Sequence, residues 1–206
     1  RSIRPLFPEG FKNEVQVFVN VISADQENDA DVLALVAASY ALSASRVPFA
    51  GPIAGVRVGR VQGNWILNPT FQQLEYSDLD LVVAGSQDSI VMVEGGALEV
   101  SEQDVVQALT VAHGGVRELI AAQEELMQAA GRADKMAWTQ ATLPEGLQAR
   151  VDELAKGKIA EAINQADKHT RMAAVHAAKQ AVKEVLVLDY ADNAKDIGNL
   201  LGDVEY

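Results

Sequence analysis

The sequence predicts an α/β unit followed by a small all-helical domain. Valines recur at every second position from Val15 to Val21, and this period of two is typical of a strand. Apolar residues recur at helical spacing between Ser101 and Gly131, and beyond residue 142 the sequence carries helix signals alone. We therefore expect a partial α/β core over residues 1–131, a linker over 132–141 and an all-helical domain over 142–206.

The first strand and the first helix are expected near the N-terminus. Residues 13–23 alternate in polarity and predict the strand. Residues 29–45 are Ala-rich and contain neither Gly nor Pro, which predicts a buried helix. Asp29 or Asp31 is a suitable N-cap for this helix, because an aspartate side chain accepts hydrogen bonds from the first N–H groups.

A β-meander and a long helix complete the expected α/β unit. A hairpin turns near Gln62-Gly63-Asn64. Two further strands cover residues 79–86 and 89–96, and the second ends in a turn at Glu94-Gly95-Gly96. The long helix begins after Ser101, which is a good N-cap because acidic residues follow it in the first turn.

The all-helical domain is predicted from a cap and from apolar stripes. Thr142-Leu143-Pro144-Glu145 matches a capping box with proline in the first turn. Residues 193–204 predict a last short helix with Ile197, Leu200 and Leu201 facing inward. The preceding stripes are Leu147, Val151, Leu154, Ala155, Ile159 and Ile163, then Met172, Val175, Val182, Val185 and Leu186.

Composition and charge narrow the class of protein. Of the 206 residues 49% are apolar, so we expect a sizeable core. The formal charge is −12, so we do not expect the chain to bind nucleic acid through its overall charge. The absence of cysteine excludes a disulfide scaffold and fits a cytoplasmic location. No apolar run reaches the length of a membrane span, so we expect no membrane partner. The start resembles no signal peptide, and we expect a piece of a longer chain.

Asp78 and Asp80 form the first candidate site. At positions i and i+2 of a strand, both carboxylates lie on one face, where together they can hold Mg²⁺. The alternative is a solvated loop that enters a strand, because no third oxygen ligand is obvious. His113, His169 and His176 have no partner at ligand spacing, so packing or partial exposure explains them.

Arginines supply the second candidate site. Arg1 and Arg4 lie in the segment with the least negative charge balance, and arginine can bind a phosphate through two parallel hydrogen bonds. Pro5 biases Arg4 toward an extended conformation. The same chemistry is available from Arg46, Arg57 and Arg60. The alternative for these arginines is an ordinary surface position near a turn.

Several stretches of the chain resemble one known family. They are RSIRPLFPEGF with NEVQV, ALSASRVPFAGPIAGVRVG, LDLVVAGSQDSIVMVEGGA and ADKHTR. In this order and spacing they are similar to bacterial polynucleotide phosphorylase (polyribonucleotide nucleotidyltransferase). The resemblance implies the later part of the first of two ribonuclease PH-like cores, followed by most of an all-helical domain. It also implies a homotrimeric ring with an RNA channel, and the rest of the same polypeptide as a partner.

The resemblance places the active site in the second core, outside this segment. There a Gly-Ser-Ser-Gln run binds phosphate, and an Asp-x-Asp-x-Lys run supplies metal ligands and a cation. At the matching places this chain has Asn28-Asp29-Ala30-Asp31, and Val82 and Leu74 replace the lysine and a further aspartate. Carboxylates at a helix start repel phosphate. We therefore expect no catalytic residue and no metal ligand here, with Mg²⁺ bound elsewhere in the enzyme.

The function that the resemblance implies is phosphorolytic 3′→5′ exoribonuclease activity in mRNA degradation. Inorganic phosphate attacks the last phosphodiester and releases a nucleoside diphosphate, while this segment scaffolds the ring and the RNA channel. Arg1 and Arg4 are then the expected RNA- or phosphate-binding residues. One alternative is a non-catalytic ring subunit or scaffold with the ribonuclease PH fold, and another is an unrelated α/β protein.

Overall fold

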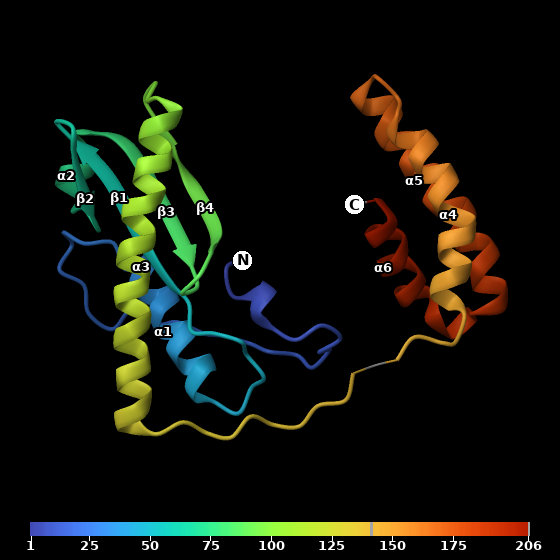
Figure 1. Cartoon of the computed structure of the whole chain (residues 1–206), viewed down its shortest axis with the longest axis horizontal. Helices are drawn as coiled ribbons and strands as arrows, with labels where there is room; N and C mark the ends of the chain where they lie inside the picture. Colours follow the sequence, from blue (N-terminus) through green and yellow to red (C-terminus); the bar gives the residue numbers. More distant parts are fainter. Residues whose placement is uncertain (141, 206) are drawn as a thin grey trace. The chain divides into compact units, whose positions relative to one another are not determined.

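The computed structural model describes residues 1–140 and 142–205 (Figure 1). The chain forms two compact units, Arg1–Gln140 and Ala141–Tyr206. The first is a mixed α/β unit and the second is all-helical, which confirms the predicted fold class. Among the described residues, no helix is both long enough and apolar enough to cross a membrane.

A four-stranded antiparallel sheet forms the centre of the first unit. The strands are β1 (Ala54–Val61), β2 (Asn64–Leu67), β3 (Ser77–Gly85) and β4 (Ile90–Ala97), in the order β2-β1-β3-β4, and a short helix α2 (Phe71–Leu74) joins β2 to β3. The predicted hairpin is confirmed, because Gln62 and Gly63 have the positive φ angles (50° and 79°) that a two-residue turn favours. The predicted turn at Glu94-Gly95-Gly96 was wrong, since β4 continues through it to Ala97.

The long helix α3 (Glu102–Ala130) packs against the sheet (Figure 1). Ser101 caps it as predicted, since the Ser101 hydroxyl accepts a hydrogen bond from the N–H of Asp104. Small residues on its inner side allow a close approach, and a Cβ added at Gly115 would lie 3.1 Å from Leu67 Cδ1. The core between sheet and helix contains Ala54, Val56, Val58, Leu79, Leu81, Val83, Ala108, Ala112, Val116 and Ile120.

Helix α1 (Asp31–Ala44) confirms the Ala-rich helix predicted at residues 29–45. Its N-cap residue is Ala30, although Asp29 Oδ1 accepts a hydrogen bond from the N–H of Asp31 at 3.2 Å. The buried hydroxyl of Ser39 accepts a hydrogen bond from the N–H of Ile53 at 2.9 Å, which ties the helix to the chain just before β1. This bond fixes where α1 lies relative to the start of the sheet.

Residues 13–23 do not form the predicted strand. The segment follows the short 3-10 helix η1 (Arg4–Leu6) and makes no β-ladder with the described residues. Its apolar side chains are exposed, by 80% for Phe18 and 98% for Ile22. The period of two determines which side chains share a face, but a strand also needs a neighbour with which to exchange hydrogen bonds. The prediction was wrong because the described residues supply no such neighbour.

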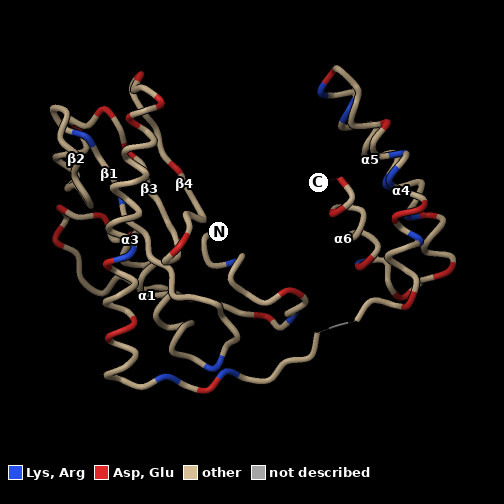
Figure 2. The backbone as a smooth tube through the Cα atoms, viewed as in Figure 1, with Lys and Arg blue, Asp and Glu red and all other residues tan. Residues whose placement is uncertain are grey.

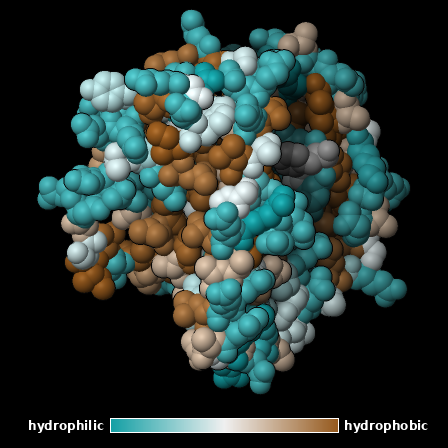
Figure 3. Space-filling view, turned by 60° about the vertical axis from the view of Figure 1, so that its left-hand side comes forward, coloured by the Kyte–Doolittle hydropathy of each residue, from teal (hydrophilic) through white to brown (hydrophobic). Residues whose placement is uncertain are grey.

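A second apolar surface lies between α1 and α3. Leu33 and Leu126 are more than half exposed there, at 66% and 52%. They belong to a cavity of about 440 Å³ that is lined by Leu33, Val36, Ala37, Tyr40, Leu119, Ala122, Gln123 and Leu126. Hydrophobic residues reach the surface as brown patches in the view of Figure 3. Apolar surface of this kind is typical of a protein that has a partner.

Residues 132–140, which the sequence assigns to a linker, lie against the first unit. The N–H groups of Ala133 and Met136 donate to the carbonyls of Ala44 and Arg46, at 3.0 and 2.7 Å. Lys135 Nζ lies within 3.0 Å of three carbonyl oxygens at the end of α1, those of Leu42, Ser43 and Ser45. A cation at this position satisfies the last carbonyls of the helix and opposes the negative end of its dipole.

Three helices build the second unit. They are α4 (Leu147–Ile163), α5 (Lys168–Asp189) and α6 (Ala194–Glu205), with the 3-10 helix η2 (Ala191–Asn193) before the last. The predicted final helix is confirmed, and Ile197, Leu200 and Leu201 are buried in it. The core of the unit contains Leu147, Val151, Ala155, Ile159, Val182, Leu186, Ile197, Leu200 and Leu201.

The predicted capping box of this unit was wrong. Helix α4 begins after Gly146, which has a φ of 79° and provides no side-chain cap. The N–H of Leu147 instead donates to the carbonyl of Pro144 at 3.2 Å, so the chain turns before the helix starts. Ile163 and Met172, two members of the predicted apolar stripes, are 39% and 62% exposed rather than buried.

Candidate functional site

Arg57 on β1 is held by three aspartates from two parts of the first unit. Its Nη1 donates to both carboxylate oxygens of Asp80 on β3, at 3.0 and 2.9 Å. Its Nη2 donates to Asp31 at 2.6 Å and to Asp29 at 3.2 Å, both at the start of α1. The Arg57 side chain is 15% exposed, so water screens these pairs less than it screens ordinary surface pairs.

The surroundings of Arg57 carry an excess of negative charge. A cavity of about 440 Å³ beside it is lined by Ser2, Asp31, Val32, Leu35, Arg57, Asp80, Val82, Met92, Glu94 and Gly95. Its lining thus holds three carboxylates and one guanidinium. Burial alone would lower the pKa of Arg57, but the hydrogen bond and charge of Asp31, together with Asp80, raise it. Arg57 therefore remains a cation whose charge is already neutralised within the chain.

Arg60, three residues after Arg57 on the same strand, forms a second cluster. Its Nε donates to Asp78 Oδ1 at 2.9 Å and its Nη2 to Asp78 Oδ2 at 2.8 Å. Its Nη1 lies 2.9 Å from Asp104 Oδ2 in the first turn of α3. The hydrogen bonds from Arg60 lower the pKa of both carboxyl groups. The guanidinium also lies over the Trp65 ring, 5.3 Å from its centroid, so the cluster joins the sheet to α3.

These clusters show which partners Asp78 and Asp80 have within the chain. Each carboxylate is bonded to a different arginine of β1. In the described part of the chain, no group of three or more His, Asp or Glu side chains is placed to hold a metal ion. Arg57 and Arg60, which the sequence offered as phosphate-binding arginines, both form ion pairs with aspartates of the chain.

The predicted contacts Arg1 and Arg4 lie on the surface. Arg1 Nη1 is 3.9 Å from Glu94 Oε2, and these side chains are 78% and 69% exposed, so water screens this ion pair strongly. Arg4 is exposed and begins η1, beside a shallow cavity that Phe7 and Phe11 also line. Both side chains are accessible to a ligand, and their role in binding stays a prediction.

The histidines differ in their surroundings. His113 Nε2 lies 3.1 Å from the carbonyl oxygen of Ser86, and its Nδ1 lies 3.2 Å from Arg117 Nη2. His113 therefore joins α3 to the β3–β4 turn. His169 and His176 are exposed on α5, next to basic residues. The net charge of residues 132–206 does not reveal these residues, because acidic residues elsewhere in that range offset them.

Comparison with protein families separates the helical unit from the first unit, as the fold does, and divides the first unit into two matched ranges. Residues 1–48 match the model of the 3′ exoribonuclease family, domain 1, and residues 51–115 match domain 2 of that family. Residues 146–206 match "Polyribonucleotide nucleotidyltransferase, RNA binding domain". The whole chain is 71% identical to the polyribonucleotide nucleotidyltransferase of Gemmatimonas aurantiaca. The chain belongs to the polyribonucleotide nucleotidyltransferase family.

Polyribonucleotide nucleotidyltransferases of two other bacteria also match the whole chain. Those of Nitratidesulfovibrio vulgaris and Geobacter sulfurreducens are 49% and 45% identical to this chain, and both matches cover all of it. The chain spans 28–29% of the length of these three relatives. The resemblance found in the sequence is therefore confirmed, and it concerns less than a third of a polyribonucleotide nucleotidyltransferase.

Proposed function

We propose that this chain is a non-catalytic segment of a phosphorolytic 3′→5′ exoribonuclease that degrades mRNA. The whole enzyme transfers the terminal nucleotide of RNA to inorganic phosphate, so that one phosphodiester bond breaks and a nucleoside diphosphate leaves. Catalysis of this kind depends on positioned cations that neutralise the charge of the transferred group. This segment contributes the scaffold of a homotrimeric ring and of its RNA channel.

The hydrogen bonds between Arg57 and three aspartates carry the proposal of a non-catalytic role. A phosphate site at the start of a helix needs free N–H groups and hydroxyls or cations. At the start of α1 the chain presents Asp29 and Asp31, and their carboxylates already neutralise Arg57. A phosphate entering this cavity would meet surplus negative charge and would have to displace two ion pairs.

The residues of this segment do not fit Mg²⁺. Asp78 and Asp80 are the carboxylates with the best spacing for it, and each is engaged by an arginine. A divalent cation would have to compete with a guanidinium at both positions. The proposal therefore places Mg²⁺ elsewhere in the enzyme and routes no step of the reaction through this chain.

The exposed apolar surface supports an assembled enzyme. Phe18 and Ile22 are exposed on an unpaired extended segment, and Leu33 is exposed between α1 and α3. Such surface favours partners, which the proposal identifies as the rest of the polypeptide and two further copies of it. A cytoplasmic location fits a chain without cysteine, because a reducing compartment has no disulfide to break in it.

The test is release of nucleoside diphosphate from poly(A) in the presence of Mg²⁺ and phosphate. We expect the full-length enzyme to release it and the 206-residue chain to release no more than a heat-inactivated control. Release by the chain above that control would disprove the non-catalytic role. If the full-length protein is also inactive, the alternative of a non-catalytic ring subunit replaces the enzyme.

A further inference from the structure

The first sixteen residues of α5 form a basic stretch in an acidic protein. Residues 168–183 contain Lys168, Arg171, Lys179 and Lys183 and no acidic residue, while the whole chain carries a charge of −12. Figure 2 marks these basic positions in blue along α5. His169 and His176 lie in the same stretch and are exposed. A helix with this local charge attracts a polyanion despite the acidity of the chain.

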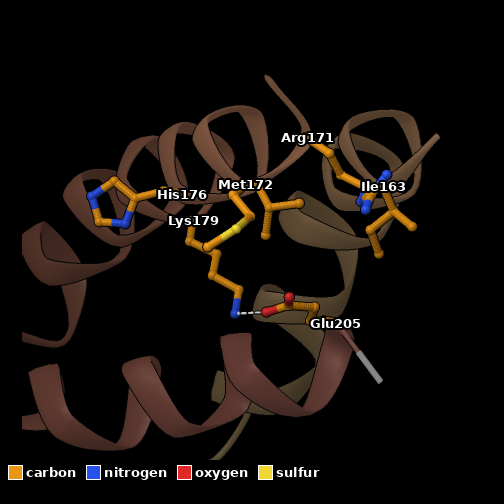
Figure 4. Close-up of a pocket in the computed structure, with 7 residues that line it drawn as sticks. Ile163, Arg171, Met172, His176, Lys179 and Glu205 are labelled. Atoms are coloured by element: carbon orange, nitrogen blue, oxygen red, sulfur yellow. Dashed lines mark hydrogen bonds and ion pairs between the residues drawn. The ribbon is translucent and has the colours of Figure 1, made fainter. Parts of the chain in front are cut away.

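A pocket opens on this stretch, within the second unit. It has a volume of about 420 Å³, a size at which small-molecule sites begin, and is lined by Ile163, Arg171, Met172, Val175, His176, Lys179 and Glu205. Ile163 comes from α4, Glu205 from α6 and the rest from α5 (Figure 4). Three helices of one unit thus fix its walls.

The pocket combines an apolar floor with a polar edge. Ile163 and Met172 are 39% and 62% exposed, although both belong to apolar stripes that predict burial, so their surface is available to a ligand. Lys179 Nζ bonds to the carboxylate of Glu205, and Figure 4 shows this pair at the side of the pocket. The pair offers a donor and an acceptor next to the apolar floor.

The charges around the pocket favour an anion at its rim. Arg171 Nη1 donates to the carbonyls of Gln165 and Ala166, at 3.0 and 3.4 Å, so hydrogen bonds hold its cation in place. Among the described residues, no carboxylate forms an ion pair with it. Lys179 neutralises Glu205, which leaves the lining with a net positive charge. The rim therefore suits a phosphate, while the floor suits a flat apolar group.

We propose that this pocket binds single-stranded RNA, with one unstacked base on the Met172 floor and the flanking phosphates along the basic residues of α5. The proposal rests on the proposed function and goes further, because it assigns one base and its flanking phosphates to named residues within a unit that matches an RNA binding domain. Proteins bind single-stranded RNA by stacking bases on side chains such as histidine and by neutralising the backbone. His176 at the edge of the pocket and the Lys179–Glu205 pair supply a stacking surface and a polar edge for the base.

Methionine methyl groups report on this site directly. The chain has four methionines, and Met172 lies in the pocket whereas Met92, Met127 and Met136 lie in the first unit. We expect a short oligo(A) to shift the ¹³C-methyl resonance of Met172 in the 206-residue chain and to leave the buried Met127 unchanged. Inorganic polyphosphate is the matched polyanion without bases. An equal shift of Met172 with polyphosphate would overturn the insertion of a base, and no shift with oligo(A) would overturn the site.

Single-charge variants test the same site by affinity. Lys179→Ala and His176→Ala should weaken oligo(A) binding several-fold, and Lys179→Arg should restore it. The slope of log affinity against log salt should flatten by about 0.7 for Arg171→Ala, because Arg171 bonds to carbonyl oxygens and keeps its charge for a phosphate. Lys158→Ala on α4 removes an equal charge from an exposed position outside the pocket, and it should bind like the unchanged chain. Equal affinities for Lys179→Ala and Lys158→Ala would refute the pocket, whereas the release of nucleoside diphosphate by the full-length enzyme would still test the proposed function separately.

Discussion

Arg57 Nη1 on β1 lies 3.0 and 2.9 Å from the two carboxylate oxygens of Asp80 on β3. The same guanidinium reaches the start of α1 through Asp31, so one side chain joins two strands to a helix. In an active phosphate site an arginine would keep this donor capacity for the ligand. Here both Nη groups of Arg57 donate to aspartates of the same chain and connect β1 to β3 and α1.

The first prediction concerns removal of this arginine. Arg57→Ala leaves Asp29, Asp31 and Asp80 facing one another without a cation, and we expect the free energy of unfolding of the first unit to fall by about 1–3 kcal/mol. The fall is less than for a fully buried pair, because the carboxylates are 35–44% exposed. Urea unfolding followed by tryptophan fluorescence measures it, since both tryptophans, Trp65 and Trp138, lie in this unit.

The control for this prediction is Arg46→Ala. Arg46 is exposed, so its removal should change the free energy of unfolding by no more than about 0.5 kcal/mol. If the two variants are equally stable, Arg57 does not hold the sheet and α1 together. Its ion pairs would then be ordinary surface pairs of little energetic consequence.

The second prediction concerns acid. The hydrogen bonds from Arg60 lower the pKa of Asp78 in the folded chain, so the carboxylate stabilises the fold at neutral pH and stops doing so as the pH falls through the lowered value. Asp78→Asn should therefore be less stable than the unchanged chain at pH 7, and the difference should shrink below about pH 4. Urea unfolding at a series of pH values measures this difference. A difference that stays constant with pH would show that charge is not its cause.

The third prediction compares two neighbouring glycines on β4. A Cβ at Gly95 would lie 2.0 Å from the carbonyl oxygen of Asp80, whereas nothing lies within 4 Å of a Cβ at Gly96. Gly95→Ala should therefore force β4 away from β3 and lower the free energy of unfolding by about 2 kcal/mol or more, while Gly96→Ala should change it by under about 1 kcal/mol. Thermal unfolding gives the melting temperature of each variant, and equal melting temperatures would contradict the prediction.

Local signals in the sequence predict the elements whose partners lie close along the chain. Ser101 caps α3 because the residue that it bonds, Asp104, lies three positions later. The two-residue turn at Gln62 and Gly63 is local in the same way. Thr142 has the same local pattern as Ser101, but the chain turns through Pro144 and Gly146 instead, since a weak cap yields to other backbone bonds.

Long-range relationships could not be predicted, because they depend on strand register. The sequence places Asp78 and Asp80 on one face of β3, but whether metal or arginine fills that face depends on how β1 pairs with it. Gly59 lies opposite Asp80, and the register shifts between Gly59 and Val61, which brings each arginine to a different aspartate. The need for glycine at position 95 also depends on strand pairing, since the carbonyl oxygen of Asp80 approaches it from β3.

The fourth prediction concerns the extended segment between residues 13 and 23. Phe18 and Ile22 are 80% and 98% exposed, so the 206-residue chain should self-associate through this segment at micromolar concentration. Phe18→Ser with Ile22→Ser should shift it toward the monomer in sedimentation velocity. Leu188→Ser is the control, because Leu188 is 84% exposed on α5, outside the segment. If the chain is monomeric without substitution, this segment is no docking surface for a partner.

The last prediction concerns Arg1 and Arg4 in the full-length enzyme. Both side chains are exposed, and the weak pair between Arg1 and Glu94 leaves the Arg1 guanidinium accessible to phosphate. Arginines that hold phosphates without touching bases should bind all RNA sequences alike. Arg1→Ala with Arg4→Ala should therefore weaken binding of poly(A) and of poly(U) by the same factor.

The salt dependence distinguishes this role from a purely structural one. Each phosphate contact that is lost should flatten the slope of log affinity against log salt by about 0.7, so the double variant should lose about 1.4. Arg132→Ala, another exposed arginine of the first unit, should leave the slope unchanged. An unchanged affinity and slope in the double variant would assign Arg1 and Arg4 to shaping the chain at the start of η1. RNA binding by this chain would then depend on α5 alone. Lys179→Ala in the full-length enzyme should in that case remove the whole contribution of this chain to RNA affinity.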